Sequence, residues 1–193
     1  MAETSQTSVA VLVSGSGTLL QAILDDQSSY RVDLVVADVE CSALDRARKA
    51  GVRTEVVALD GDRDQWNRRL ANTVGDPDIV VSAGFMKIVG EAFLERFEGR
   101  LINTHPALLP AFPGAHAVRD ALAYGVKVTG TTVHYIDAGV DTGEIIAQRA
   151  VDVRNGETEE ELHERIKEVE RALIVDTLNR AETSTTGKVE FPA

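Results

Sequence analysis

The sequence has a single cysteine and no long apolar run. Cys41 stands alone among 193 residues, which excludes an internal disulfide and any Cys-x-x-Cys metal or redox motif. No apolar segment approaches the roughly 20 residues that are needed to span a bilayer. The first eight residues lack the basic and apolar regions of a signal peptide. We therefore expect a cytoplasmic protein that has no membrane partner.

Basic residues are also scarce relative to acidic ones. The chain contains 31 Asp and Glu but only 20 Lys and Arg, which gives a formal net charge of −11 at pH 7. A charge of this sign repels polyphosphate backbones, so nucleic-acid binding is not expected as the main function. A small anionic ligand is compatible with this charge if its site supplies local positive charge or aimed backbone N–H groups.

What is present suits one domain of ordinary size. Apolar residues make up 44% of the chain, which is enough for a sizeable core. In the first half, apolar runs alternate with segments of helical period, a pattern typical of parallel strands with helices on both faces of the sheet. Strands are expected over 8–13, 32–39, 52–59 and 78–83, and helices from residue 18 and over 44–50 and 62–74.

The second half predicts a change of strand direction. A strand over 100–105 leads into a Pro-rich loop and a helix around 117–124. The β-rich runs 126–136 and 144–153 are too close in sequence for a crossover, so we expect an antiparallel pair. A long amphipathic helix over 158–180 follows. We predict an α/β fold with a Rossmann-like, mixed, mostly parallel sheet. It forms a single domain over residues 1–181, followed by a polar, loosely attached tail over 182–193.

A glycine-rich turn follows the first expected strand. In Gly15-Ser16-Gly17-Thr18, the glycines let backbone N–H groups approach a phosphate at the positive end of a helix dipole. Leu20 occupies the place of the third glycine of the dinucleotide-binding motif, so that motif is weak here. A Walker A loop is excluded, because no Gly-Lys-Ser/Thr follows. Both a monophosphate site and a plain turn are compatible with this segment.

An Asn-x-His-Pro segment ends the strand over 100–105. Asn103 and His105 are two residues apart, so on a strand their side chains share one face. An amide donor beside an imidazole could stabilise a developing oxyanion, and Pro106 restrains His105 to an extended backbone. The alternative is a histidine that is only satisfied by hydrogen bonds at a strand end.

Two acidic features accompany this pair. The loop from Asp137 to Gly143 carries two carboxylates, and Asp141 could orient an imidazole or move a proton through water, although such loops are ordinarily plain turns. Glu170 interrupts the apolar stripe of the last helix. It could accept hydrogen bonds from ligand hydroxyls, as carboxylates do from ribose. It could equally pair with Lys167 or Arg171 at the edge of the stripe.

The four histidines do not predict a metal site. His116 and His134 could join His105, but the chain has no His-Glu-x-x-His motif, no His-x-His cluster and no set of cysteines. We therefore expect no metal. His163 is expected to face solvent on the polar side of the last helix, without a role.

Four segments together resemble the glycinamide ribonucleotide transformylases, a family of folate-dependent formyltransferases. The segments are Val-Ser-Gly-Ser-Gly-Thr-Leu-Leu-Gln-Ala at 13–22, Ala-Gly-Phe-Met-Lys-Ile-Val at 83–89, Asn-Thr-His-Pro-Ala-Leu-Leu-Pro-Ala-Phe-Pro-Gly-Ala-His at 103–116, and Asp-Ala-Gly-Val-Asp-Thr-Gly at 137–143. They occur in the family's order and spacing, and the resemblance covers roughly residues 8 to 180. The fold that it implies is the formyltransferase fold.

The resemblance implies formyl transfer from 10-formyltetrahydrofolate to the glycyl amine of glycinamide ribonucleotide, in a monomer or homodimer without a metal. By position, it makes Asn103, His105 and Asp141 the catalytic trio. The implied contacts to the phosphoribosyl substrate are Gly15, Ser16, Gly17, Thr18, Leu19 and Glu170. The implied folate contacts are Arg63, Met86, Lys87, Ile88, Val89, Asp137, Ala138, Gly139 and Val140. His116 is implied to support the site from the Pro-rich loop.

The chain departs from the family pattern without losing the trio. Leu19 stands where family members commonly carry Asn, Lys87 replaces a frequent Arg, and Ala107 replaces a Ser after His-Pro. Methionyl-tRNA formyltransferases are similar but carry a further domain and act on a polyanion. Formyltetrahydrofolate hydrolases generally have His-His where this chain has His105-Pro106. A non-catalytic nucleotide-binding module is the alternative from another functional class.

Overall fold

The computed structural model describes residues 6–183 and 189–192. Seven strands form one mixed sheet in the order β3-β2-β1-β4-β5-β6-β7. Their bounds are β1 Thr7–Val13, β2 Tyr30–Ala37, β3 Arg53–Val56, β4 Ile79–Ser82, β5 Leu101–His105, β6 Val128–Tyr135 and β7 Ile145–Asp152. The strands β1 to β5 pair in parallel, whereas β5–β6 and β6–β7 are antiparallel. The predicted mixed, mostly parallel sheet is therefore confirmed.

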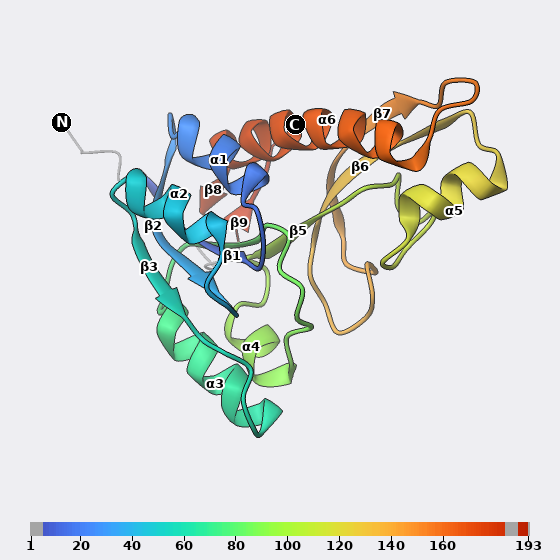
Figure 1. Cartoon of the computed structure of the whole chain (residues 1–193). Coiled ribbons are helices and arrows are strands. Elements are labelled where there is room, and N and C mark those ends of the chain that lie inside the picture. The colour runs from blue at the N-terminus through green and yellow to red at the C-terminus, as the bar shows by residue number, and fades with distance from the viewer. Residues whose placement is uncertain (1–5, 184–188, 193) are drawn as a thin grey trace.

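Helices cover both faces of this sheet, as Figure 1 shows. On one face, α1 (Thr18–Asp25), α2 (Ser42–Lys49) and α6 (Glu159–Asn179) pack over a core that includes Leu20, Leu44 and Ile174. On the other face, α3 (Arg63–Val74) and α4 (Glu91–Arg96) enclose a second core around Trp66 and Phe93. The short helix α5 (Ala117–Tyr124) packs beside α6. The sequence analysis did not predict α4, which has little more than one turn.

Local signals explain where the longer helices begin. The Asp62 side chain accepts a hydrogen bond from the backbone N–H of Gln65, which caps α3. Thr158 and Glu161 form a reciprocal capping box at the start of α6. Because α6 is amphipathic, its buried stripe packs on β6 and β7 and leaves its acidic face exposed. Among the residues described, no helix has the length and apolar character to cross a membrane.

The segment after α6 differs from the prediction. Glu182–Thr183 (β8) and Val189–Glu190 (β9) form a two-stranded antiparallel sheet. Val189 is fully buried in the core, its N–H donates to the Gly99 carbonyl, and its carbonyl accepts a hydrogen bond from the Tyr135 hydroxyl. The expectation of a loosely attached tail is therefore wrong for these residues, because one apolar side chain and two hydrogen bonds to the Val189 backbone anchor the segment. Residues 184–188 and 193 lie outside the described part of the chain.

Candidate active site

A cavity of about 640 Å³ opens at the carboxyl ends of β1, β4 and β5. The connections from β1 and β4 leave the sheet toward opposite faces, which is the switch point where open α/β sheets bind ligands. Its lining residues are 15–19, 83–88, 103–106, 114–115, 140–141, His163, Lys167 and Glu170. Segments that are far apart in the sequence thus share one concave surface.

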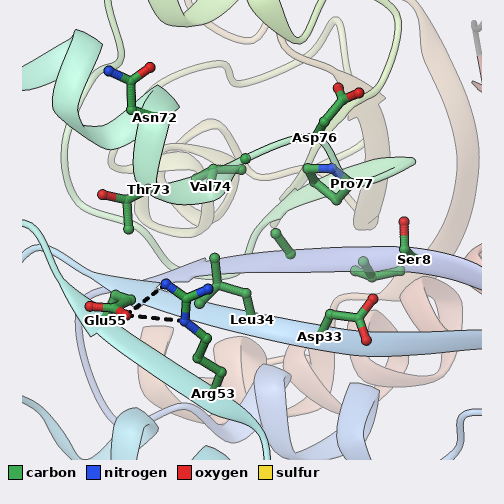
Figure 2. A pocket seen from close by; sticks show the side chains of 13 residues that line it. Ser8, Asp33, Leu34, Arg53, Glu55, Asn72, Thr73, Val74, Asp76 and Pro77 are labelled. Carbon is green, nitrogen blue, oxygen red and sulfur yellow. Dashed lines mark hydrogen bonds and ion pairs between the residues drawn. The ribbon is translucent and has the colours of Figure 1, made fainter.

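A second cavity, drawn in Figure 2, lies near the amino ends of β1 and β3. Its volume is about 440 Å³, and it contains none of the predicted site residues. Arg53 is its most prominent cation, but its guanidinium donates two hydrogen bonds to Glu55. The cavity therefore offers no free positive charge for an anionic ligand, and the switch-point cavity is the better candidate.

The glycine-rich turn enters α1 in a conformation that only glycine adopts easily. Gly17 has a φ of 72°, and a Cβ built on it would lie 2.6 Å from the Ala43 Cβ. Ala43 donates its N–H to the Gly15 carbonyl, and Arg46 Nε donates to the Ser16 carbonyl at 2.8 Å. Two residues of α2 thus hold the turn through its carbonyl groups. No described side chain caps the first N–H groups of α1. These N–H groups can receive an anion.

Leu19 contributes differently from the other residues of this turn. Its side chain is only 8% exposed and packs in the core under α1. A leucine in this position has no polar atom for the phosphoribosyl group, so only its backbone N–H can serve the predicted contact. The predicted contact of Leu19 with the phosphoribosyl group can therefore come only from its backbone N–H.

The end of β5 places Asn103 and His105 at the cavity. His105 is 4% exposed, and its Nε2 lies 2.8 Å from the Phe112 carbonyl oxygen. Its Nδ1 lies 3.4 Å from Asp141 Oδ2. A carbonyl oxygen and an ionised carboxylate can only accept hydrogen bonds. Both ring nitrogens of His105 therefore face hydrogen-bond acceptors.

Asp141 reaches the site from an unusual backbone conformation. Its φ is 54°, a left-handed region that asparagine and aspartate tolerate better than most residues. The Gly114 N–H donates to Asp141 Oδ2 at 2.7 Å. In the same loop, Asp137 Oδ1 accepts hydrogen bonds from the Gly139 N–H and the Thr142 hydroxyl. The loop therefore holds the Asp141 carboxylate toward His105 through several bonds.

His134 is a buried neighbour of the trio to which the sequence analysis gave no role. It lies opposite Asn103 in the β5–β6 register and is 2% exposed. Its Nε2 is 3.4 Å from Asn103 Nδ2 and 3.7 Å from Asp141 Oδ1. Burial lowers the pKa of the His134 imidazole below its usual value. No local sequence signal could have found this contact, because it depends on the register between two strands.

The helix α6 turns three side chains toward the cavity. His163, Lys167 and Glu170 follow the i, i+4, i+7 spacing of one helical face. Burial raises the pKa of Glu170, although a hydrogen bond from Thr104 opposes the shift. Lys167 Nζ is 2.7 Å from Glu164 Oε1. His163 is partly exposed beside Glu160 and Glu164 on the polar side of the helix, but it also lines the cavity, and burial lowers its pKa.

The predicted folate residues divide into two groups. Four of them line the cavity, namely Met86, Lys87, Ile88 and Val140. Met86 is 77% exposed and Ile88 is 75% exposed. Arg63 does not line the cavity, because it donates to the Ile88 carbonyl and braces that segment from outside. The remaining predicted contacts are likewise absent from the cavity lining, and they are Val89, Asp137, Ala138, Gly139 and the supporting His116.

An ion pair between a buried carboxylate and a partly exposed lysine accompanies the cavity segment 83–88. Lys87 Nζ lies 3.3 Å from Asp38 Oδ2 at the end of β2. This is where dinucleotide-binding folds place the acid that binds a ribose. The Asp38 carboxylate is buried and engaged by Lys87, so it is not presented to a nucleotide. This arrangement adds to the missing third glycine as an argument against dinucleotide binding.

Known proteins resemble this chain over most of its length. The family model described as formyl transferase matches residues 7–178. The phosphoribosylglycinamide formyltransferase of Mycobacterium tuberculosis H37Rv is 54% identical over 174 residues, which cover 86% of this chain and 81% of that protein. The Escherichia coli K12 protein of the same name is 37% identical over 174 residues, which cover 86% of this chain and 82% of that protein.

A solved structure has the same fold over almost the entire length. It is the crystal structure of glycinamide ribonucleotide transformylase 1 from Symbiobacterium toebii, with a TM-score of 0.88 and 39% sequence identity. The match covers 97% of this chain and 95% of that one. Fold, cavity position and sequence identity lead to one conclusion: the chain belongs to the formyl transferase family.

Proposed function

We propose that this protein transfers a formyl group from 10-formyltetrahydrofolate to the glycyl amine of glycinamide ribonucleotide, a step of purine biosynthesis. The observation that carries the proposal is the meeting of Asn103, His105 and Asp141 at one end of a cavity whose other end is the glycine-rich turn. The names of the relatives from Mycobacterium tuberculosis and Escherichia coli support formyl transfer to phosphoribosylglycinamide, and the folate donor rests on the family resemblance.

The ribonucleotide occupies the side of the cavity between α1 and α6. Its phosphate accepts hydrogen bonds from the backbone N–H groups of residues 15–19, at the positive end of the α1 dipole. The net charge of −11 does not prevent this binding, because aimed N–H groups act locally whereas the surface charge is spread and screened. Glu170 accepts hydrogen bonds from the ribose hydroxyls.

The folate occupies the side of the cavity formed by segment 83–88 and Val140. Met86, Ile88 and Val140 are large apolar side chains that stay exposed, as expected for a surface that an aromatic ligand covers. The Met86 N–H and the Ile88 carbonyl are already bonded to Ser14 and Arg63, so other backbone groups of the segment meet the polar edge of the pterin. Arg63 supports this segment through the Ile88 carbonyl.

The reaction joins the two substrates directly. The free glycyl amine attacks the formyl carbon, a C–N bond forms, and the carbonyl electrons move to oxygen. Asn103 donates a hydrogen bond to this oxyanion and the charge of protonated His105 stabilises it, while Asp141 orients His105 and accepts the amine proton through water. The tetrahedral intermediate collapses as its bond to the folate nitrogen breaks, and that nitrogen takes a proton. No covalent enzyme intermediate is needed.

Product analysis tests the proposal. The purified protein is mixed with 10-formyltetrahydrofolate, with and without glycinamide ribonucleotide. We expect deformylated folate and formylated ribonucleotide in equal amounts, and only when both substrates are present. Deformylation without the amine would indicate a hydrolase instead. Binding of the ribonucleotide without any turnover would indicate a non-catalytic nucleotide-binding module.

A further inference from the structure

His134 is a buried polar side chain that the reaction described above does not use. It lies on β6, directly across the antiparallel pairing from Asn103, and its imidazole is 2% exposed. Three polar groups surround its two ring nitrogens: the Tyr135 carbonyl, the Asn103 amide and the Asp141 carboxylate. A buried imidazole with such neighbours must present a defined pattern of donors and acceptors.

The Tyr135 carbonyl determines the tautomer of His134. The Nδ1 atom lies 2.9 Å from this oxygen, which can only accept a hydrogen bond. The proton of the neutral ring therefore sits on Nδ1. Burial favours the neutral ring, because a charged imidazole loses more solvation. In this state Nε2 carries a lone pair and acts as an acceptor.

The acceptor at Nε2 in turn determines the orientation of the Asn103 amide. An amide can place either its oxygen or its nitrogen toward a neighbour, but an acceptor pairs only with the nitrogen. Asn103 Nδ2 lies 3.4 Å from His134 Nε2, so one of its N–H groups is used there. No other described residue bonds to this nitrogen, and Asn103 lines the cavity. Its second N–H is therefore left for a ligand.

We propose that His134, as the neutral Nδ1–H tautomer, is a positioning residue that holds the Asn103 amide with an N–H directed at the reacting formyl oxygen. This inference rests on the proposed function, since it requires Asn103 to be an oxyanion donor. Without the acceptor at Nε2, the amide can rotate and present its oxygen to the oxyanion, where it would repel rather than stabilise charge.

Protonation of His134 would reverse this arrangement. A proton on Nε2 would oppose the Asn103 N–H and face Asp141 Oδ1, which is 3.7 Å away. The titratable groups that face His134 are Asp141, Asp137 and His105, and the two aspartates favour the proton whereas His105 opposes it. Acidification should therefore lower kcat partly through His134, in addition to any effect of the trio.

Two substitutions separate positioning from packing. His134→Gln places an acceptor oxygen near the position of Nε2, whereas His134→Leu offers none. We expect His134→Leu to lower kcat by about 10- to 100-fold, the scale of a misplaced catalytic group, with the KM of both substrates unchanged. His134→Gln should have a kcat close to that of the unsubstituted protein. In this variant the part of the fall in kcat at low pH that is due to His134 protonation should disappear. Thr131→Val is the matched control: Thr131 is buried in the same strand, and its hydroxyl has no partner among the described residues.

A double-mutant cycle tests whether the effect passes through Asn103. In the Asn103→Ala background, His134→Leu should cost no more than about twofold further in kcat, because the group that it positions is gone. A full additional loss there, or a rise in KM instead of a fall in kcat, overturns the inference while leaving the proposed function intact. If Asn103→Ala alone kept normal turnover, both would fail.

The tautomer can be measured without any activity assay. In ¹⁵N-labelled protein at neutral pH, two-bond ¹H–¹⁵N correlations distinguish the two neutral forms of each histidine. We expect His134 to carry its proton on Nδ1, with the His134→Gln spectrum assigning the signal. A proton on Nε2, or a charged ring at neutral pH, would contradict the inference. This measurement also keeps the inference testable if His134→Leu fails to fold.

Discussion

His105 and Asp141 are held together both directly and through the Pro-rich loop. The imidazole Nδ1 lies 3.4 Å from the carboxylate Oδ2. The loop supplies a second connection, because the Phe112 carbonyl accepts from His105 Nε2 and the Gly114 N–H donates to the same Asp141 oxygen. Residues 106–114 therefore align the two side chains before any substrate binds, which reduces the reorganisation that the reaction requires.

Removing the imidazole should affect turnover much more than binding. For His105→Ala we expect kcat to fall by roughly 10²–10³-fold, the usual cost of losing one group that stabilises the oxyanion, with a much smaller change in KM. Steady-state kinetics with each substrate varied in turn measures both quantities. Near-normal turnover would exclude the proposed role of His105.

The Asp141 carboxylate can be neutralised without disturbing its backbone. Asparagine tolerates the left-handed φ of 54° about as well as aspartate. Asp141→Asn should therefore keep the melting temperature while lowering kcat by roughly 10²-fold, because His105 loses its anionic partner. Asp141→Ala should also lose stability, by about 1 kcal/mol or more for a strained backbone. Equal activity of Asp141→Asn and the unsubstituted protein would contradict the role of the charge.

Glu170 should act on ribonucleotide binding alone. For Glu170→Ala we expect weaker binding of glycinamide ribonucleotide by calorimetry, with folate affinity unchanged. An unchanged ribonucleotide affinity would assign Glu170 a purely structural role.

The raised pKa of Glu170 also gives two pH effects of known sign. As the pH falls through this pKa, the carboxylate is protonated and ribonucleotide affinity declines. The titration of the substrate phosphate is common to the protein and its Glu170→Gln variant, so their difference isolates Glu170. Because the folded pKa lies above the unfolded one, Glu170 lowers stability as the pH rises through that window. Glu170→Gln should therefore be the more stable protein at neutral pH.

The glycine-rich turn should tolerate alanine at Gly15 but not at Gly17. At Gly17, alanine would be strained by about 1–2 kcal/mol in the left-handed region, before any contact with Ala43 is counted. The melting temperature should fall by roughly 2–8 °C. A Cβ at Gly15 meets nothing within 4 Å, so Gly15→Ala should change stability by less than about 0.5 kcal/mol. Equal melting temperatures of the two variants would contradict the described turn.

Much of the fold was accessible from local patterns. The alternation of apolar runs and helical segments, and the short connection between 126–136 and 144–153, predicted the mixed sheet that the structure contains. The sequence analysis missed α4 because a helix of six residues is too short to show a helical repeat of apolar residues. The burial of Val189 was not predicted because a single apolar residue among polar neighbours gives no recognisable pattern.

The candidate site was accessible only in part. Asn103, His105 and Asp141 were singled out from their residue types and motifs, and the structure places them at one cavity. The contact of His134 with Asn103 and the position of His163 at the cavity were not predicted. The folate contact of Arg63 stays a prediction, and in the structure its guanidinium donates to the Ile88 carbonyl. The neighbours of each of these side chains come from a distant part of the chain.

The sequence by itself determined the class of fold, the order of the motifs and the chemical groups available, because periodicity and turn chemistry act over a few residues. Only the tertiary structure decided which of these groups meet. The register between β5 and β6 sets His134 against Asn103, and the path of residues 106–114 returns the Phe112 carbonyl to His105. Strand register and loop closure depend on contacts across the whole core, and no local pattern specifies them.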